Sequence, residues 1–83
     1  MNSFQVEIRT KDDTLYQGCA KHVQLKSVNG CIGITTHTTH LLGVLVPCNI
    51  NVLTDSESTP SYSFSCLSGF YLKCDTLLKI ILQ

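Results

Sequence analysis

Hydrophobic and polar residues alternate along much of the chain with a period of two. The clearest stretch is FQVEIR, in which Phe4, Val6 and Ile8 fall on one side and polar residues fall on the other. Such alternation predicts a strand with one buried face, because successive side chains of a strand point to opposite faces. The same pattern recurs in HVQLKSV, NINVLT and YSFSC, at 22–28, 49–54 and 62–66.

Short polar segments separate the expected strands. Lys11–Thr14, Asp55–Pro60 and Asp75–Thr76 are typical of turns or loops. Asn29–Gly30 is a strong hairpin signal, because both residues accept a positive φ. Gly33, in the return strand CIGI, marks either a bulge or a close approach of the backbone.

These elements predict an all-β fold. We count about eight or nine short strands, with turns about every 8–12 residues and no convincing helix, which is typical of a sandwich or barrel. The prediction is one domain over residues 1–83, a small β-sandwich or flattened barrel of about eight to ten short strands.

Charge narrows the possible functions. Six basic and six acidic residues leave the 83-residue chain with no net charge, and only 14% of its residues are charged, below the usual quarter. A nucleic-acid-binding surface needs an excess of positive charge, so no nucleic acid is expected as a partner. The low charge favours a surface covered by protein partners; a solvated surface rich in Ser and Thr is the alternative.

No part of the sequence predicts insertion into a membrane. No apolar run approaches the roughly 20 residues of a spanning helix. The opening MNSFQVEIRT is neither a basic segment followed by an apolar one nor rich in Arg, so we expect no signal or transit peptide. The chain is therefore expected in a reducing compartment.

The cysteines support a reducing compartment. Their number is odd, and no two of them form a C-x-x-C pair, which argues against a zinc site and against a thioredoxin-like redox motif. In the expected strands, Cys66 falls on the same side as Tyr62 and Phe64. Cys74 falls on the same side as Phe70 and Leu72. Since buried cysteine behaves as a small hydrophobe, we expect free and mostly core thiols. The five are Cys19, Cys31, Cys48, Cys66 and Cys74.

The segment NGCIGITTHTTHLLGVL, at 29–45, holds the main candidate chemistry. His37 and His40 would share a face only on a helix, and their β-branched and polar neighbours favour an exposed loop instead. Zinc would need a third and a fourth ligand. His22 and Cys31 are the only plausible donors, and neither has a motif spacing, so no metal site is expected. A small His/Cys metal-binding protein remains the least favoured alternative.

No arrangement of residues predicts catalysis. Cys31 lies near His37 in the sequence, but a thiol nucleophile needs a base within hydrogen-bond reach and a third group that orients it. No phosphate-binding glycine motif is present, and the tyrosines are too scattered for a base-stacking platform. The residues alone therefore predict a binding module with no catalytic residues and no cofactor, such as a free-standing β-sandwich adaptor.

Four segments resemble, in register, a known family. FQVEIRTKDDTLYQG, HVQLKSVNGCIGI, Leu41–Leu42 followed by Pro47, and LSGFYL are similar to the N-terminal β-sandwich domain of the ε subunit of F-type ATP synthase, called δ in mitochondria. Gly30 and Gly33 match glycines of the family's V/I-x-φ-x-G-x-x-G-x-φ-G-I motif. The resemblance spans Phe4–Leu82.

The chain departs from the family in the histidine segment. The family usually has G-I-x-P-G-H-A-P-L-L, and this chain has GITTHTTHLL, so neither histidine aligns with the family's histidine. Cys31 stands where an acidic residue is common. Family members commonly carry a C-terminal helical hairpin, which we expect this chain, ending at Gln83, to lack. The replaced positions are Thr36, His37, Thr38 and His40.

The resemblance implies a non-catalytic central-stalk subunit that helps couple proton-driven rotation to ATP synthesis. Its implied partners are the γ subunit along one fairly apolar face, the c-ring loops at one end, and indirectly α and β. Its implied location is the F1 sector at the cytoplasmic face of the bacterial inner membrane. Asn29 and Gly30 would shape its hairpin. The c-ring-facing residues it implies are Cys31, Gly33, Thr36, His37, Thr38, His40, Leu41 and Leu42.

The two histidines suggest a role for pH. An ordinary histidine pKa of about 6.5 lies near neutrality, and both side chains belong to the implied contact loop. We therefore hypothesise that protonation of His37 and His40 alters docking to the ring. Coupled proton pumping with an unchanged pH profile in a His37→Asn/His40→Asn variant would contradict this.

Overall fold

The computed structural model of the chain describes residues 3–38, 40–54 and 62–83, and these form nine strands without a helix. The all-β prediction is therefore confirmed, as is the number of short strands. The predicted loop Asp55–Pro60 lies outside the described residues. The strands are β1 Phe4–Arg9, β2 Thr14–Ala20, β3 His22–Ser27, β4 Gly30–Thr35, β5 His40–Leu45, β6 Cys48–Leu53, β7 Tyr62–Cys66, β8 Gly69–Cys74 and β9 Leu77–Leu82.

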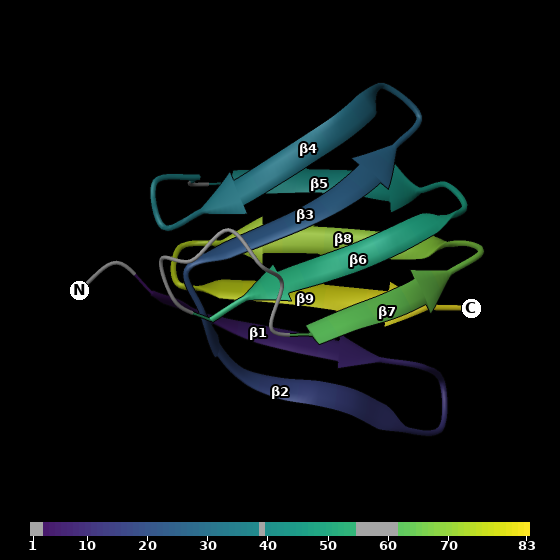
Figure 1. Cartoon of the computed structure of the whole chain (residues 1–83), viewed down its shortest axis with the longest axis horizontal. Helices are drawn as coiled ribbons and strands as arrows, with labels where there is room; N and C mark the ends of the chain where they lie inside the picture. Colours follow the sequence, from purple (N-terminus) through teal and green to yellow (C-terminus); the bar gives the residue numbers. More distant parts are fainter. Residues whose placement is uncertain (1–2, 39, 55–61) are drawn as a thin grey trace.

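The strands form one curled sheet in the order β2-β1-β9-β8-β5-β3-β6-β7, with β4 beside β3. The curl makes two layers, with β4, β3, β6 and β7 in one and the remaining strands in the other (Figure 1). The layers join where Ser27 of β3 pairs with Leu45 of β5. There the Val46 amide also donates to the Lys26 carbonyl at 3.2 Å. The result is a half-barrel.

Aromatic side chains bring together the two outermost strands of the curled sheet. The ring of Tyr16 on β2 lies 4.9 Å from that of Tyr62 and 6.2 Å from that of Phe64 on β7. The Tyr16 hydroxyl donates to the Cys19 carbonyl at 3.0 Å. Burial, reinforced by Tyr62 and Cys19, raises the pKa of Tyr16. Ring packing thus supplements the backbone hydrogen bonds in holding the curl together.

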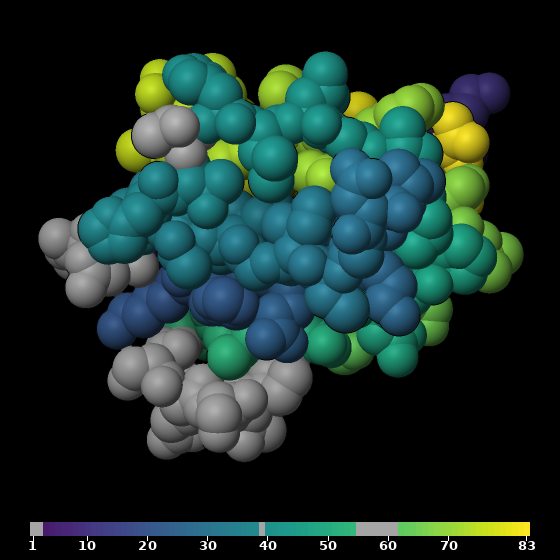
Figure 2. All heavy atoms as spheres, turned by 90° about the horizontal axis from the view of Figure 1, so that it is seen from above, coloured from purple at the N-terminus to yellow at the C-terminus, as the bar shows by residue number. Residues whose placement is uncertain are grey.

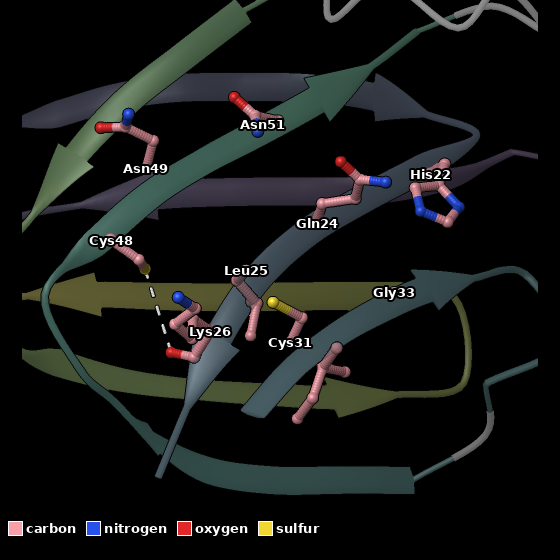
Figure 3. A pocket seen from close by; sticks show the side chains of 10 residues that line it. His22, Gln24, Leu25, Lys26, Cys31, Gly33, Cys48, Asn49 and Asn51 are labelled. Atoms are coloured by element: carbon pink, nitrogen blue, oxygen red, sulfur yellow. Dashed lines mark hydrogen bonds between the residues drawn. The ribbon is translucent and has the colours of Figure 1, made fainter. Parts of the chain in front are cut away.

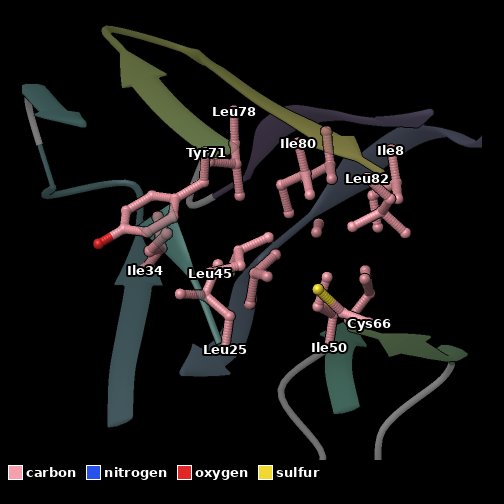
Figure 4. Close-up of a cluster of buried hydrophobic side chains, with 14 of the residues drawn as sticks. Ile8, Leu25, Ile34, Leu45, Ile50, Cys66, Tyr71, Leu78, Ile80 and Leu82 are labelled. Atoms are coloured by element: carbon pink, nitrogen blue, oxygen red, sulfur yellow. The ribbon is translucent and has the colours of Figure 1, made fainter. Parts of the chain in front are cut away.

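The core lies between the two layers (Figure 4). The alternation predicted for the first strand is confirmed, since Phe4, Val6 and Ile8 are all buried. Ile80 from the same layer and Ile34 from the opposite one are also fully buried. Each such aliphatic side chain contributes about 1.5–3 kcal/mol through removal of apolar surface from water.

The hairpin between β3 and β4 differs from the prediction in its backbone. Ser27 pairs with Gly30 across a two-residue turn, Val28–Asn29. Gly30 has a φ of 115°, whereas Asn29, which could accept a positive φ, is not among the residues that have one. The Asn29 amide instead donates to the Ser27 hydroxyl at 3.2 Å, which fixes the turn through a side chain.

All five cysteines are free, as expected, but the prediction of mostly core thiols is wrong. Cys66 is buried and Cys48 is half-buried. Cys74 does share the parity of Phe70 and Leu72, but all three lie on the outer side of β8. Alternate positions of a strand share one side, but the sequence pattern does not say whether that side faces the core. The exposed cysteines are Cys19, Cys31 and Cys74.

The strand connections gather at two ends of the molecule (Figure 1). The pairing register decides which connections share an end: Leu45 lies opposite both Ser27 and Gly69. We term one end the turn end, with residues 10–13, 28–29, 46–47 and 67–68. The opposite one is the histidine end, with residues 21, 36–38 and 75–76.

Candidate functional site

The outer side of β5, β8 and β9 carries a continuous set of exposed hydrophobic side chains, which we term the apolar face. The strand register places them side by side: Leu42 lies opposite Leu72. Phe70 lies between Val44 on β5 and Ile81 on β9. Each exposes more than a third of its surface, and Leu42 exposes 73%. The apolar face comprises Leu42, Val44, Phe70, Leu72, Leu77 and Ile81.

The apolar face arises because its strands are apolar at consecutive positions. In 41–45, 70–72 and 77–82, one set of hydrophobic residues fills the core and the intervening set remains outside. Strands that are apolar on both sides are typical of sheets covered on both faces. Contiguous exposed apolar surface marks interaction sites. This signal was already in the sequence, but alternation alone does not reveal it.

The inward residues of β8 hold this strand in its orientation. Gly69 packs against the backbone of Ile81, where an added Cβ would not fit. The Tyr71 ring covers Gly43 on β5 in the same way, and Tyr71 is buried. Because Gly69 and Tyr71 must face inward, Phe70 and the alternate positions after it face outward.

The outer side of β3, β4 and β6 is polar, and we term it the polar face. A shallow groove of about 520 Å³ runs over it, and the side chains that point into it come from all three strands (Figure 3). The Asn51 amide oxygen accepts a hydrogen bond from the Ser63 hydroxyl at 2.9 Å. The His22 ring lies against Gly33, about 3.0 Å from where a Cβ would stand, so a side chain makes the close approach, and not the backbone as was predicted. The polar face comprises His22, Gln24, Lys26, Cys31, Asn49 and Asn51.

The histidine segment forms a tight turn that uses its own hydroxyl groups. The His37 amide donates to Thr35 Oγ1 and the Thr35 amide donates to Thr38 Oγ1, both at 3.2 Å. His37 is exposed in this turn, as predicted, but His40 is the first residue of β5 rather than part of a loop. His40 Nε2 lies 4.0 Å from Asp75 Oδ1, with both side chains largely exposed. The two histidines therefore belong to different elements.

Lys73 anchors this turn from the interior. It is 0% exposed, and its Nζ donates to the Thr38 carbonyl at 2.7 Å and to the Asp75 carbonyl. Nζ also lies 5.2 Å from the centroid of the Phe4 ring. Burial of a cation is costly unless polar groups surround it, and here two carbonyls and one ring do so. Lys73 thereby ties the turn after β4 to the turn after β8.

The structure does not bring the predicted c-ring-facing residues together at one end. Cys31 lies next to the β3–β4 turn, at the turn end, and pairs with Lys26. Thr36, His37 and Thr38 follow β4 at the histidine end. Seen from above, β4 runs between these two ends (Figure 2). At about 3.3 Å per residue, roughly 13 Å separates Cys31 from the start of the histidine turn.

The described residues offer no group of three or more His, Cys, Asp or Glu side chains that would hold a metal ion. Cys31 and His37 lie at opposite ends of β4. The arrangement that the geometry does support is a pair of contrasting surfaces for binding other molecules. Within the part of the chain that the structure describes, no helix has the length and hydropathy to cross a membrane.

Comparisons with known proteins show the fold. No family model matches the chain, and no curated protein matches it. A chain of the Tetrahymena thermophila mitochondrial ATP synthase central stalk and c-ring structure superposes with a TM-score of 0.75 at 20% identity, covering 95% of this chain. A chain of the Euglena gracilis mitochondrial ATP synthase OSCP/F1/c-ring structure superposes with a TM-score of 0.75 at 13% identity, covering 93% of this chain. This chain spans 62% and 48% of their lengths, respectively.

Proposed function

We propose that this chain is a non-catalytic central-stalk subunit of a rotary F-type ATP synthase, which docks the γ subunit onto the c-ring and helps couple proton-driven rotation to ATP synthesis. The observation that carries the proposal is the fold match over nearly the whole chain to chains of two ATP synthase structures. The four sequence segments that resemble the ε subunit support it independently. Both structural neighbours are mitochondrial, so they do not favour the bacterial membrane over the mitochondrial one.

In this proposal the apolar face binds the γ subunit. Its residues are contiguous across three strands, and lone exposed hydrophobes would not need a partner. Stable interfaces have an apolar core from which charged residues are depleted. Leu42, Phe70 and Leu72 provide such a core, since each offers about half or more of its surface. The polar face, apart from Cys31 next to the β3–β4 turn, then remains in solvent.

We further propose that the turn end, with Cys31, contacts the c-ring loops. Val28 and Leu67, at the tips of two of its turns, are 72% and 78% exposed. At the histidine end, by contrast, the hydroxyls of Thr35 and Thr38 already bond backbone amides. Because the two ends lie at opposite ends of β4, a single flat contact with the ring includes only one of them.

Affinity purification of the tagged chain from its native membranes, followed by mass spectrometry, tests the stalk role. We expect co-purification of the γ, α and β subunits. A Leu72→Glu variant should lose them, and a Gln24→Glu variant, with the same change on the polar face, should retain them. Recovery of one unrelated partner in place of these subunits would favour the free-standing adaptor.

Native cysteines allow the ring contact to be tested separately. Cys31 lies at the turn end and Cys74 lies next to the histidine end, and both are exposed. Two variants, each retaining one of them as the sole cysteine, would be labelled with a maleimide–benzophenone cross-linker in the assembled complex. We expect subunit c to be captured from Cys31 and not from Cys74. Capture from Cys74 alone would assign the ring contact to the histidine end.

A further inference from the structure

β6 and β7 bring two cysteines directly opposite each other. Cys48 is the first residue of β6 and Cys66 the last of β7, and the two are paired in the strand register. Cys66 belongs to the buried core, and Cys48 packs against it. Cys48 is also, after burial, a group whose proximity raises the pKa of Cys66. Both thiols therefore lie on the inner side of the same strand pair, at directly opposed positions.

The spacing of such a pair suits a covalent bond. Residues directly opposed in an antiparallel ladder have Cα atoms about 4.5–5.5 Å apart, within the range of about 4.4–6.8 Å found in disulfides. No other cysteine has this arrangement. Across their ladders, Cys19 faces Gln5, Cys31 faces Lys26, and Cys74 faces His40 and Leu77.

We propose that Cys48 and Cys66 are an oxidisable dithiol that closes to an intrachain disulfide on reaction with a low-molecular-weight disulfide such as glutathione disulfide. In the first step the Cys48 thiolate attacks one glutathione sulfur and releases one glutathione thiolate. In the second, the Cys66 thiolate attacks Cys48 Sγ and releases the other. The two protein thiols lose two electrons and two protons, and glutathione disulfide takes them up and becomes two molecules of reduced glutathione.

The environments of the two thiols set the order of these steps. Cys48 is half-exposed at the turn end, with its Sγ 3.9 Å from the Lys26 carbonyl oxygen. Cys66 is buried, and burial together with the neighbouring Cys48 raises its pKa. The accessible thiol of Cys48 is therefore the one that reacts with the oxidant, and the buried thiol of Cys66, directly opposite it, resolves the mixed disulfide.

The bond would clamp β6 to β7 where the chain passes between layers. Val46 and Pro47, directly before Cys48, connect β5 of one layer to β6 of the other. A cross-link between residues 48 and 66 also restricts the unfolded chain. The melting temperature should rise by on the order of 10 °C on oxidation.

The test uses a variant in which the other three cysteines are serine, Cys19→Ser/Cys31→Ser/Cys74→Ser. All three are exposed, so the substitutions leave the core intact. With glutathione disulfide at mildly alkaline pH, we expect both remaining thiols to disappear. The mass of the monomer should fall by about 2 Da, which corresponds to two hydrogen atoms. Cleavage before Asp55 should then leave two fragments joined until a reductant is added.

Three results would overturn the proposal. One is retention of both free thiols after oxidation; another is a stable glutathione adduct on Cys48 that never closes; the third is an intermolecular dimer. The wild-type chain provides a second measurement that does not depend on the variant's folding: peptide mapping should place its first disulfide at Cys48–Cys66. Neither result depends on the stalk role, so the two proposals fail separately.

Discussion

The apolar face and the polar face are built from the same kind of strand, yet they carry opposite chemistry. On the polar face the outward positions of β3 and β6 are residues such as Gln24 and Asn49, whose amides water can satisfy. On the apolar face the equivalent positions of β5 and β8 are residues such as Leu42 and Leu72. Water cannot compensate exposed hydrocarbon, which favours burial by about 25 cal/mol per Å². The polar face is therefore stable in water without a partner, whereas the apolar face would gain free energy from being covered.

The comparison also shows the limit of alternation as a guide. Alternation sorts side chains into two sets, and only tertiary packing assigns one set to the inside. In β8 the buried set includes Lys73 and the exposed set includes Phe70. A prediction from hydrophobicity alone would place Phe70 inside and Lys73 outside, the reverse of what the structure has.

The largest effect is expected from a charge placed in the apolar face. Leu72→Glu should weaken binding to purified γ subunit at least about 30-fold, because truncation or disruption of central interface residues costs about 2 kcal/mol or more. Isothermal calorimetry would measure it, with circular dichroism to confirm folding. Gln24→Glu, the matched change on the polar face, should bind as wild type. An equal loss of affinity for the γ subunit in both variants would contradict the proposal that only the apolar face binds it.

A second prediction concerns the orientation of β8. Lys73→Met should lower the free energy of unfolding by about 1–3 kcal/mol, since it leaves the Thr38 and Asp75 carbonyls without their donor. Exchange of the Thr38 amide hydrogen should accelerate as well. Denaturant unfolding and hydrogen exchange would measure these effects. Lys79→Met, on the outer side of β9, should change stability by less than about 0.5 kcal/mol; the reverse ranking would mean that β8 faces the other way.

A third prediction follows from the raised pKa of Cys66. The ordinary thiol pKa is 9.0, so in rising alkali the unfolded chain loses this proton before the folded chain does. The resulting stabilisation is complete below the unfolded-state pKa and is lost as pH rises towards the folded-state value. Urea unfolding should therefore show a steeper decline above pH 9.0 in wild type than in Cys66→Ala.

The matched control for this pH effect lies on the polar face. Cys31→Ala removes an exposed thiol and should leave the wild-type decline unchanged. Tyr16, whose pKa is raised from 10.0, adds to the decline at still higher pH in all three proteins. The attribution to Cys66 would be contradicted if the loss of stability above pH 9.0 disappeared in Cys31→Ala and persisted in Cys66→Ala.

The smallest effect is expected for exposed positions in the isolated domain. Asn49→Ser on the polar face and Leu42→Ser on the apolar face should each shift the free energy of unfolding by less than about 0.5 kcal/mol. Thermal denaturation would measure both. Only Leu42→Ser should weaken γ binding, which separates the contribution to docking from the contribution to folding. A large loss of stability in Leu42→Ser would mean that this side chain is already packed.

Much of the fold was predictable, because strand periodicity is a local property. FQVEIR and YSFSC were correctly assigned as strands, and the Val28–Gly30 region does form a hairpin turn. Asn29 could accept a positive φ but does not have one, and its amide donates to the Ser27 hydroxyl. That contact is also local, but it competes with the backbone conformation that the residue pair favours.

The candidate site was less predictable. The resemblance implied that Cys31 and His37 face the c-ring together, but the extended strand β4 places them at opposite ends of the molecule. His40 was grouped with His37, and pairing with Cys74 draws it into β5 instead. The proposed contact with the c-ring includes Cys31 of these three residues, and the c-ring role that the resemblance implied for His37 and His40 remains a prediction.

The sequence by itself determined the strand-rich class, the low charge and the two-sided apolar character of residues 70–72 and 77–82, because period, composition and turn residues are properties of short segments. Only the tertiary structure decided that Lys73 is inside and Leu72 outside, that Cys48 meets Cys66, and that the loops divide into two ends. Each of these depends on which strand lies beside which. Pairing is set by packing of the whole core, in which contacts join residues far apart in the chain.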